Sequence, residues 1–489
     1  MKIIVIGSGF GGLSCAIRLQ AQGHRVQILE KRDKTGGRAY VYEQDGFVFD
    51  GGPTIITAPW LFDELFEIAG KQTEDYVELV KINPFYNIRW EDGTIFNYND
   101  DKENLLNQIR KIAPDEVENY KRFAKDLGEI YRVGFDLIDK PFHTIGSMLR
   151  VVPQMVKLRS DRSVYRFASK YFKNEKLREA FSFHPLLIGG NPFTSTSIYA
   201  MIHELEQKFG VWFAMGGTGA LVRALSKLFT DIGGEIFLET EAGEISINEK
   251  GKADGVKLKS GEFLKADAVV SNADVAWTYL NLIPERFRRK YTDKKVKSLT
   301  YSMSLFVIYF GTNRKYENMA HHEIIMGNRY RGLLEDIFVN KTLAEDFSLY
   351  LHRPTATDKS LAPDGCDSWY VLSPVPHLQA KIDWATAAKP YRDSIINYLE
   401  TNYMPELSKH IVSEHYIDPL HFEGTLNSYL GSAFSVEPTL LQSAYLRPHN
   451  KSQDIPNLYF VGAGTHPGAG MPGVISSGKI VGNLIGKAL

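Results

Sequence analysis

A glycine-rich loop between an apolar strand and a helix is the feature that most constrains this chain. The residues Gly7-Ser8-Gly9-Phe10-Gly11-Gly12 follow a β-branched run at positions 3–6 and precede a helical stretch at 13–22. This order is typical of a βαβ unit that binds the pyrophosphate of a dinucleotide. Glu30 stands 18 residues after Gly12, at the end of the next predicted strand, where a carboxylate accepts hydrogen bonds from ribose hydroxyls.

The residues of this loop have separate physical roles. We expect Gly7 to permit the tight turn, Gly9 to let the backbone approach the pyrophosphate, and Gly12 to allow close packing of helix on strand. Phe10 and Gly11 complete the loop, which leads into a helix N-terminus that attracts phosphates. The negative charge of Glu30 disfavours a 2′-phosphate, so NADP is the least expected occupant. A glycine loop alone also fits a tight structural turn.

A second group of glycines favours FAD over NAD. Lys31 and Arg32 follow Glu30, then come Gly36-Gly37-Arg38 and the run Asp50-Gly51-Gly52-Pro53-Thr54. A second turn with an arginine suits a longer cofactor, because the guanidinium donates several hydrogen bonds to phosphate. Without the Gly36-Gly37 pair, Arg38 would be read as a surface residue.

Composition excludes several other classes of protein. The chain has 489 residues, a net charge of −1 and 44% hydrophobic residues, which argues for a globular protein and against a general nucleic-acid binder. Cys15 and Cys366 form no CxxC pair, so we expect neither disulfides nor a thiolate metal site, and a cytoplasmic location is the simplest reading. His321-His322-Glu323 lacks HExxH spacing, so no metal site is predicted and these histidines are expected at the surface or in a channel.

The order of predicted elements indicates an α/β fold. We expect a Rossmann-like FAD-binding domain in three discontinuous segments, with an inserted mixed α+β substrate domain and a helical membrane-facing region. The expected boundaries are 1–75, 215–278 and 446–489 for the cofactor segments, 76–214 for the helical region and 279–445 for the substrate domain. No apolar run approaches the roughly 20 residues that span a bilayer as a helix.

These motifs resemble the bacterial-type phytoene desaturase family. The first loop, Glu30 and Gly36-Gly37-Arg38 carry part of the resemblance, and the run NLYFVGAGTHPGAGMPGVISSG at 457–478 is the longer and more specific part. Similar blocks lie at 182–199, 210–221 and 344–352, so the resemblance covers essentially the whole chain. It implies an FAD-dependent desaturase that converts phytoene, a linear forty-carbon polyene, stepwise toward lycopene or a related polyene by hydride transfer to the flavin.

The resemblance also implies which residues contact the cofactor. It assigns the pyrophosphate to the first loop, the ribose to Glu30 with Lys31 beside it, and Arg38 to a phosphate. Thr54, after Gly52 and Pro53, is expected near the isoalloxazine ring, and the terminal segment is expected around the ribityl and flavin end. The cofactor-binding set is Gly7, Gly9, Phe10, Gly11, Gly12, Glu30, Lys31, Gly37, Arg38, Gly52, Pro53, Thr54, Gly464, Met471, Gly473 and Val474.

A basic and apolar stretch at 147–178 predicts peripheral contact with a membrane. Nine basic and two acidic residues give it a local charge of +7, with apolar residues interleaved. Arg150 is a candidate substrate-entrance or lipid-facing residue. A solvated helical face is the alternative. The family pattern has an aspartate where this chain has Ser147, so no acid or base is assigned from sequence.

The implied partners are a carotenoid in lipid, a membrane surface, and oxygen or a quinone as electron acceptor. The alternatives left open are a desaturase or oxidase of another carotenoid, such as a thirty-carbon precursor, an amine oxidase, and a non-catalytic lipid-binding escort.

Overall fold

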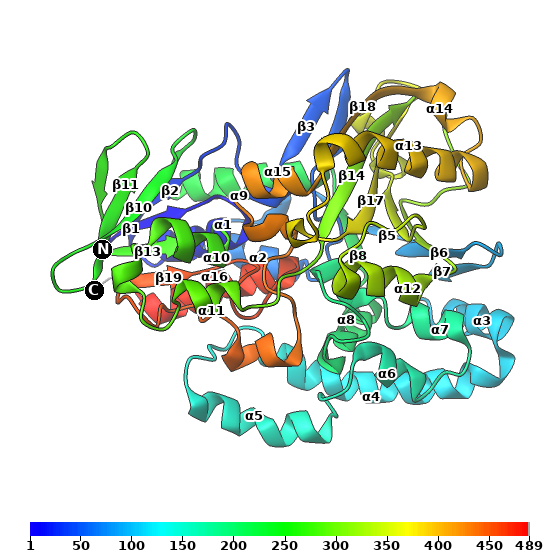
Figure 1. Ribbon diagram of the computed structural model, residues 1–489, viewed down its shortest axis with the longest axis horizontal. Helices are drawn as coiled ribbons and strands as arrows, with labels where there is room; N and C mark the ends of the chain where they lie inside the picture. The colour runs from blue at the N-terminus through cyan, green and yellow to red at the C-terminus, as the bar shows by residue number, and fades with distance from the viewer. Residues whose placement is uncertain (488–489) are drawn as a thin grey trace.

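The computed structural model, which describes residues 1–487, places the glycine-rich loop beside a five-stranded parallel sheet (Figure 1). Its strand order is β19-β13-β1-β2-β9, and every neighbouring pair is parallel. The strands come from three separated stretches of the chain: β1 (Lys2–Ile6), β2 (Arg25–Leu29), β9 (Glu235–Phe237), β13 (Ala268–Ser271) and β19 (Leu458–Phe460). The predicted α/β class is confirmed.

The two faces of this sheet are covered by different layers. Ile3 and Val5 of β1 pack with helices on one face, whereas Ile4 and Ile6 pack on the other, as the alternation of side chains along a strand requires. The first face carries α1 (Phe10–Ala21), α9 (Gly217–Asp231) and α16 (Met471–Ile485), and α2 (Trp60–Glu67) packs against them. The second face carries an antiparallel sheet of β10 (Ala242–Ile247), β11 (Ala253–Leu258) and β12 (Phe263–Lys265), with α10 (Val275–Trp277) and α11 (Asp293–Lys297).

Helices α1 and α16 approach each other closely because α16 carries a glycine at the contact. A Cβ atom on Gly478 would lie 2.6 Å from Ser14 Oγ and 2.7 Å from the backbone nitrogen of Cys15. The Ser14 hydroxyl also donates a hydrogen bond of 2.9 Å to the Ile475 carbonyl of α16. This contact fixes the C-terminal helix beside the helix of the glycine loop.

A seven-stranded mixed sheet forms the second large layer, in the order β18-β14-β17-β16-β15-β6-β7. Along β14, Leu305, Val307 and Tyr309 face one core, while Phe306 and Ile308 face another beneath α13. The strands are β6 (Tyr86–Trp90), β7 (Ile95–Tyr98), β14 (Ser304–Thr312), β15 (His322–Met326), β16 (Leu349–His352), β17 (Asp367–Val375) and β18 (Ile411–Ile417). On the outer side lie α13 (Trp384–Asn402) and α14 (Leu407–His410), with α15 (Pro419–Gly424) after β18.

Two small antiparallel pairs connect these layers. The hairpin of β3 (Val41–Gln44) and β4 (Phe47–Asp50) contacts β17, and β5 (Leu79–Ile82) pairs with β8 (Val211–Ala214). Strands β5 to β8 fall in the stretch 76–214 that was expected to be helical. Tyr86, Ile88 and Trp90 alternate with more exposed residues, and the turn Asp92-Gly93 joins β6 to β7, so this part is a hairpin.

The remaining helices form a layer on one side of the seven-stranded sheet (Figure 1). They are α3 (Lys102–Ile112), α4 (Val117–Phe135), α5 (Ile145–Lys157), α6 (Val164–Ser169), α7 (Glu175–Ala180), α8 (Met201–Phe209) and α12 (Tyr330–Glu335). Helix α5 lies at the lower edge of Figure 1, away from both large sheets. Within residues 1–487, every helix is too short or too polar to cross a bilayer.

Candidate active site

One continuous cavity of about 530 Å³ extends between the two large layers. Its first part is lined by the glycine loop, the ends of β1 and β2, and the N-terminus of α16. Its second part is lined by apolar side chains of the seven-stranded sheet and the helical layer, among them Leu305, Val307, Ile324, Met326 and Leu372. A polar compartment therefore opens directly into an apolar one.

The glycine loop lies at the wall of the polar compartment. Gly7, Gly9, Phe10 and Gly11 line it, and Gly7 has a φ of +91°, which side chains other than glycine rarely adopt. A Cβ atom on Gly11 would lie 2.7 Å from the side-chain oxygen of Asn272. Helix α1 starts beside this loop with Gly9 as its N-cap and no side chain capping it, so its first amides remain available to an anion.

The Glu30 carboxylate is held at the end of β2 by three hydrogen bonds. It accepts from the Ser8 hydroxyl at 2.6 Å, the Ser8 amide at 3.0 Å and the Arg32 amide at 3.0 Å. Its side chain is buried and lines the cavity. Lys31 lines the cavity beside it and donates to Asn427 Oδ1 at 2.8 Å, and burial lowers the pKa of its ammonium group.

The Arg38 guanidinium carries an unused donor at the cavity. One Nη donates to the Ser428 hydroxyl at 2.6 Å, whereas the buried Nε has no partner within the described residues. Burial lowers the pKa of this group, and the nearby Asp274 carboxylate opposes that shift. A partly buried cation with a free donor fits an anionic ligand group such as a phosphate.

A third side of the polar compartment comes from the run 51–54 and from α16. Thr54 shares its hydroxyl with the hydroxyls of Tyr350 at 3.0 Å and Tyr370 at 2.8 Å. Helix α16 also begins at the cavity without a capping side chain, so a second helix N-terminus faces this space. The cavity-lining residues from these two segments and the adjacent turn include Gly37, Gly52, Pro53, Thr54, Met471, Gly473 and Val474.

Three predicted site residues lie elsewhere. A Cβ on Gly12 would lie 2.2 Å from the Gly7 carbonyl oxygen, and one on Gly464 would lie 2.5 Å from the Val275 side chain, so both glycines are at packing contacts behind the wall. Arg150 is exposed on α5. Conversely, Asn272 lines the cavity and packs against the loop. The sequence could have indicated Asn272 as a site residue, because it directly follows a predicted parallel strand, and ligands bind at the carboxyl ends of such strands.

The apolar compartment contains a buried carboxylate that no sequence motif indicated. Glu206 of α8 has no exposed surface and lines the cavity. It accepts a hydrogen bond of 2.6 Å from the Tyr86 hydroxyl, and its other oxygen lies 3.2 Å from His184 Nε2. Burial, together with the Glu206 charge, raises the pKa of Tyr86 well above its usual value, so the phenol stays protonated and donates. A negative charge is thus held in an otherwise apolar wall.

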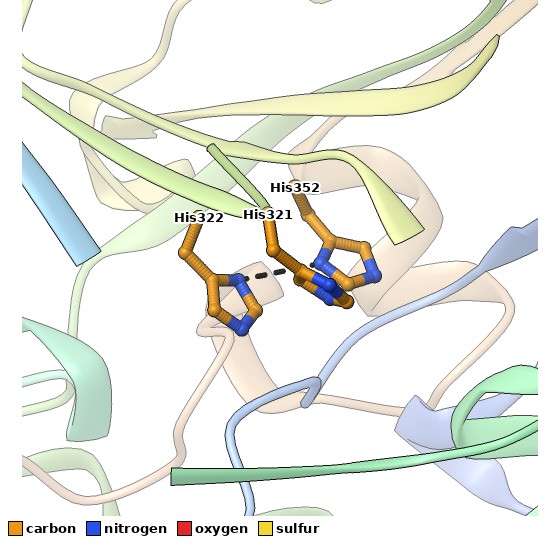
Figure 2. Close-up of side chains that lie close together, drawn as sticks. All are labelled: His321, His322 and His352. Carbon is orange, nitrogen blue, oxygen red and sulfur yellow. Dashed lines mark hydrogen bonds between the residues drawn. The ribbon is translucent and has the colours of Figure 1, made fainter. Parts of the chain in front are cut away.

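Three histidines cluster behind the wall that carries Thr54 and Tyr350 (Figure 2). His321, His322 and His352 are buried and do not line the cavity, so the expectation of surface or channel histidines is wrong. They come together because His322 and His352 stand opposite each other on β15 and β16. Burial lowers the pKa of all three imidazoles below the usual histidine value.

Within the stretch 147–178, which was predicted to form a basic and apolar surface, only α5 carries exposed apolar side chains. Tyr165, Phe167, Tyr171 and Phe172 belong to the buried core, because α6 and the following turn pack on α4 and α7. Several of the basic residues are paired within the protein, for example with Asp126 and Asp92. On α5 the exposed apolar residues are Ile145 (61%), Leu149 (64%), Val152 (38%) and Val156 (69%), and Leu441 (76%) and Leu446 (47%) are exposed on the neighbouring segment.

The same two segments also line the cavity with their inward side. Val151, Met155 and Leu158 reach it from the α5 region, and Leu440 and Ala444 reach it from the neighbouring segment. The exposed apolar surface and the apolar compartment therefore share one pair of elements.

The fold and the glycine loop define a dinucleotide-binding flavoprotein, and comparison with known families agrees. The sequence model of the family described as flavin containing amine oxidoreductase matches residues 10–485. The structure of putrescine oxidase bound to putrescine superposes with a TM-score of 0.66, at 12% identity and with 99% of each chain covered. This likeness shows a shared fold.

Curated relatives narrow the family further. The chain is 50% identical over 483 residues to a lycopene-forming phytoene desaturase from Pantoea ananas, with 98% of each chain covered. It is 45% identical to a neurosporene-forming phytoene desaturase from Cereibacter sphaeroides, with 99% of this chain and 94% of the relative covered. The chain therefore belongs to the bacterial phytoene desaturase family within the flavin-containing amine oxidoreductases.

Proposed function

We propose that this protein is a phytoene desaturase, an FAD-dependent oxidoreductase that introduces double bonds stepwise into phytoene to give lycopene or neurosporene. Full-length similarity to relatives with those activities supports the proposal. The observation that carries it is the continuity of the cavity, in which the dinucleotide-type compartment opens into an apolar one. Such a space suits a charged cofactor beside a hydrocarbon substrate.

The residues of the polar compartment fit FAD. In this proposal the amides of the glycine loop and Arg38 bind the pyrophosphate, and Glu30 accepts hydrogen bonds from ribose hydroxyls. Lys31 stands beside the ribose, and Gly37 and the run 51–54 bring the backbone close to the cofactor. Gly12 and Gly464 act through close packing. The N-terminal turn of α16, with Met471, Gly473 and Val474, stands at the flavin end, where its partial positive charge stabilises reduced flavin. The cofactor domain then comprises 1–75, 215–278 and 446–489.

When bound, FAD supplies the acceptor for the hydride equivalent that leaves the substrate. The protein has three tasks of its own: to hold the polyene in line, to exclude water and to stabilise positive charge that develops on the substrate. The side chains of β14 to β17 and of the helical layer perform the first two tasks. Oxygen or a quinone is the final electron acceptor, so each new double bond delivers two electrons and two protons.

Glu206 performs the third task. Its carboxylate accepts a hydrogen bond from Tyr86, and the residue belongs to the wall of the apolar compartment, where a negative charge would act strongly because the surroundings are apolar. No other carboxylate of the described cavity wall lies in its apolar part, since Glu30, Glu241 and Asp274 line the polar compartment.

The α5 surface, defined as the exposed apolar residues of α5 with Leu441 and Leu446, docks on a lipid surface in this proposal. Phytoene dissolves in lipid, and α5 stands between the exposed apolar residues and the cavity. Arg150 and Lys157 on the same helix are exposed and placed to contact anionic headgroups. The protein is thereby a peripheral membrane protein whose entrance faces the bilayer.

The test uses purified protein loaded with FAD and liposomes that contain phytoene, with oxygen or a quinone present. Chromatography of the extracted lipids should show products with longer conjugated systems, ending at neurosporene or lycopene. A parallel experiment supplies a thirty-carbon precursor in liposomes of the same composition. Faster conversion of that precursor would assign the protein to a different carotenoid, and no conversion of either substrate would contradict the proposal.

A further inference from the structure

The three histidines behind the cavity wall stand close enough together to hold a metal ion. One side-chain nitrogen from each of His321, His322 and His352 lies within 4.8 Å of those from the other two. Their rings are 4.5 to 5.1 Å apart between centroids. All three side chains are at most 4% exposed, and Figure 2 shows the rings gathered around one point.

We propose that His321, His322 and His352 bind a divalent transition-metal ion, with zinc as the best match. The spacing of two of the nitrogens supports this assignment. His322 Nδ1 and His352 Nδ1 are 3.3 Å apart. Two ligands of one tetrahedral zinc ion, each bonded at about 2.0–2.1 Å, stand about 3.3–3.4 Å apart. The observed separation, which also allows a hydrogen bond between the two imidazoles, matches that of two ligands on a shared ion.

The third ligand is Nε2 of His321. Its Nδ1 is already engaged, at 2.6 Å, by the Thr357 hydroxyl, and its buried Nε2 has no partner within residues 1–487. A metal-binding histidine is usually oriented by a hydrogen bond at its other nitrogen, and Thr357 supplies that contact here. A buried imidazole nitrogen without a partner is unfavourable, and a metal ion would satisfy it.

A buried carboxylate stands behind the second histidine. Asp50 Oδ2 lies 3.7 Å from His352 Nε2, and neither atom has a hydrogen-bond partner among the described residues. No lysine or arginine of the described chain forms an ion pair with Asp50, which is 3% exposed. A carboxylate paired with a ligating histidine is the usual outer contact of zinc sites, and a divalent cation would offset the buried negative charge.

The nature of the ligands selects the ion. Three imidazoles suit zinc, copper, nickel or iron, whereas magnesium and calcium require oxygen ligands. Zinc accepts a tetrahedral arrangement with three histidines and one further ligand. The Tyr350 hydroxyl lies 2.7 Å from His322 Nδ1 and 3.0 Å from Thr54 Oγ1, so Thr54 can take over its hydrogen bond when the ion occupies that nitrogen.

An ion at this point would connect three parts of the cavity wall. His322 and His352 belong to β15 and β16, and Asp50 ends β4 just before the run 51–54 that lines the cavity. The ion would hold His322 and His352 in place behind Tyr350 and Thr54. It would have a positioning role and would not touch the substrate. This reverses the expectation from sequence, in which His321-His322-Glu323 lacked a metal-binding spacing.

The test measures metal directly in FAD-loaded protein. Protein equilibrated with zinc and then freed of loose ions by gel filtration should contain about one zinc per chain by mass spectrometry. The double variant His322→Ala, His352→Ala should lose it, whereas His410→Ala, a partly exposed histidine outside the cluster, should retain it. Zinc retained by the double variant would place the ion elsewhere and overturn the proposal.

A measurement on the unaltered protein covers the case in which the variants do not fold. Cobalt added to metal-stripped protein should give the visible absorption of a tetrahedral site, and zinc should abolish it. Zinc should also raise the melting temperature of stripped protein, and a chelator should lower that of the zinc-loaded protein. A cobalt spectrum equal to that of free cobalt, with melting unchanged by zinc or chelator, would contradict the site.

Discussion

The Tyr86 hydroxyl donates a 2.6 Å hydrogen bond to the buried carboxylate of Glu206 at the wall of the apolar compartment. The two residues are 120 positions apart, on β6 and α8, and they meet because β6 belongs to the seven-stranded sheet over which the helical layer packs. This contact fixes one negative charge where the proposed substrate develops positive charge.

Glu206→Gln keeps the size and a hydrogen-bond acceptor for Tyr86 but removes the charge. We expect kcat for phytoene to fall about 100- to 1,000-fold, the range seen when one electrostatic contact to a transition state is lost. FAD content and melting temperature should change little. Glu204→Gln, on the same helix but partly exposed and paired with Lys208, is the matched control. Equal kcat in the two variants would remove Glu206 from the reaction.

Arg38→Gln should weaken FAD binding. The variant removes the partly buried cation and its free Nε donor. A charge-assisted hydrogen bond contributes about 1.5–3 kcal/mol, equivalent to roughly a 10- to 150-fold rise in Kd. Equilibrium dialysis or fluorescence titration of stripped protein with FAD measures this change. Arg25→Gln, an exposed arginine at the start of β2, should bind FAD as the unaltered protein does. An unchanged Kd for Arg38→Gln would place the pyrophosphate elsewhere.

Gly478→Ala should destabilise the protein although it adds one methyl group. The new Cβ would lie 2.7 Å from a backbone atom of α1, so α1 and α16 must move apart, and overpacking of this kind costs about 1–3 kcal/mol. Thermal unfolding and the fraction of bound FAD should both decrease. Gly424→Ala, where nothing lies within 4 Å of the added atom, should leave both unchanged. Full stability of Gly478→Ala would show that the two helices are not tightly packed.

Charge introduced into the α5 surface should reduce membrane binding. The double variant Leu149→Glu, Val156→Glu replaces two exposed apolar side chains, and loss of their burial in lipid should lower liposome cosedimentation about tenfold or more. Activity toward phytoene in liposomes should fall with it. Val412→Glu alters an equally apolar but distant exposed site on β18, at the opposite edge of Figure 1 from α5. Equal cosedimentation of the two proteins would reject the docking surface.

Short local sequence patterns were sufficient to predict the cofactor-binding half of the fold. The predicted strand at 3–6 falls within β1, and the predicted helix at 13–22 lies within one turn of α1, because the hydrophobic pattern of each element is contained in a few neighbouring residues. On the substrate side, the residue pattern predicts a helix that starts at Pro390. Helix α13 instead begins at Trp384, since Asp383 caps it and Pro390 stands inside it.

The structure of the substrate side could not be predicted in the same way, because it depends on contacts between distant segments that no local sequence pattern contains. Helical spacing at 164–172 gave no sign that Phe167 and Phe172 face the core, because the covering helix α4 lies far earlier in the chain. Glu206 is likewise an ordinary residue of a mixed helix until β6 brings Tyr86 to it. His322 and His352 meet only through the pairing of β15 with β16.

The central claim is that one cavity brings a flavin and a polyene together for oxidation. Anaerobic mixing of FAD-loaded protein with phytoene-containing liposomes tests it most directly, because without an electron acceptor the bound flavin must retain the electrons. We expect the visible absorption of oxidised flavin to disappear, with one new double bond in the carotenoid for each flavin reduced, and to return when oxygen or a quinone is admitted. Flavin that stays oxidised in the presence of bound phytoene would contradict the account and would favour a lipid-binding protein without redox activity.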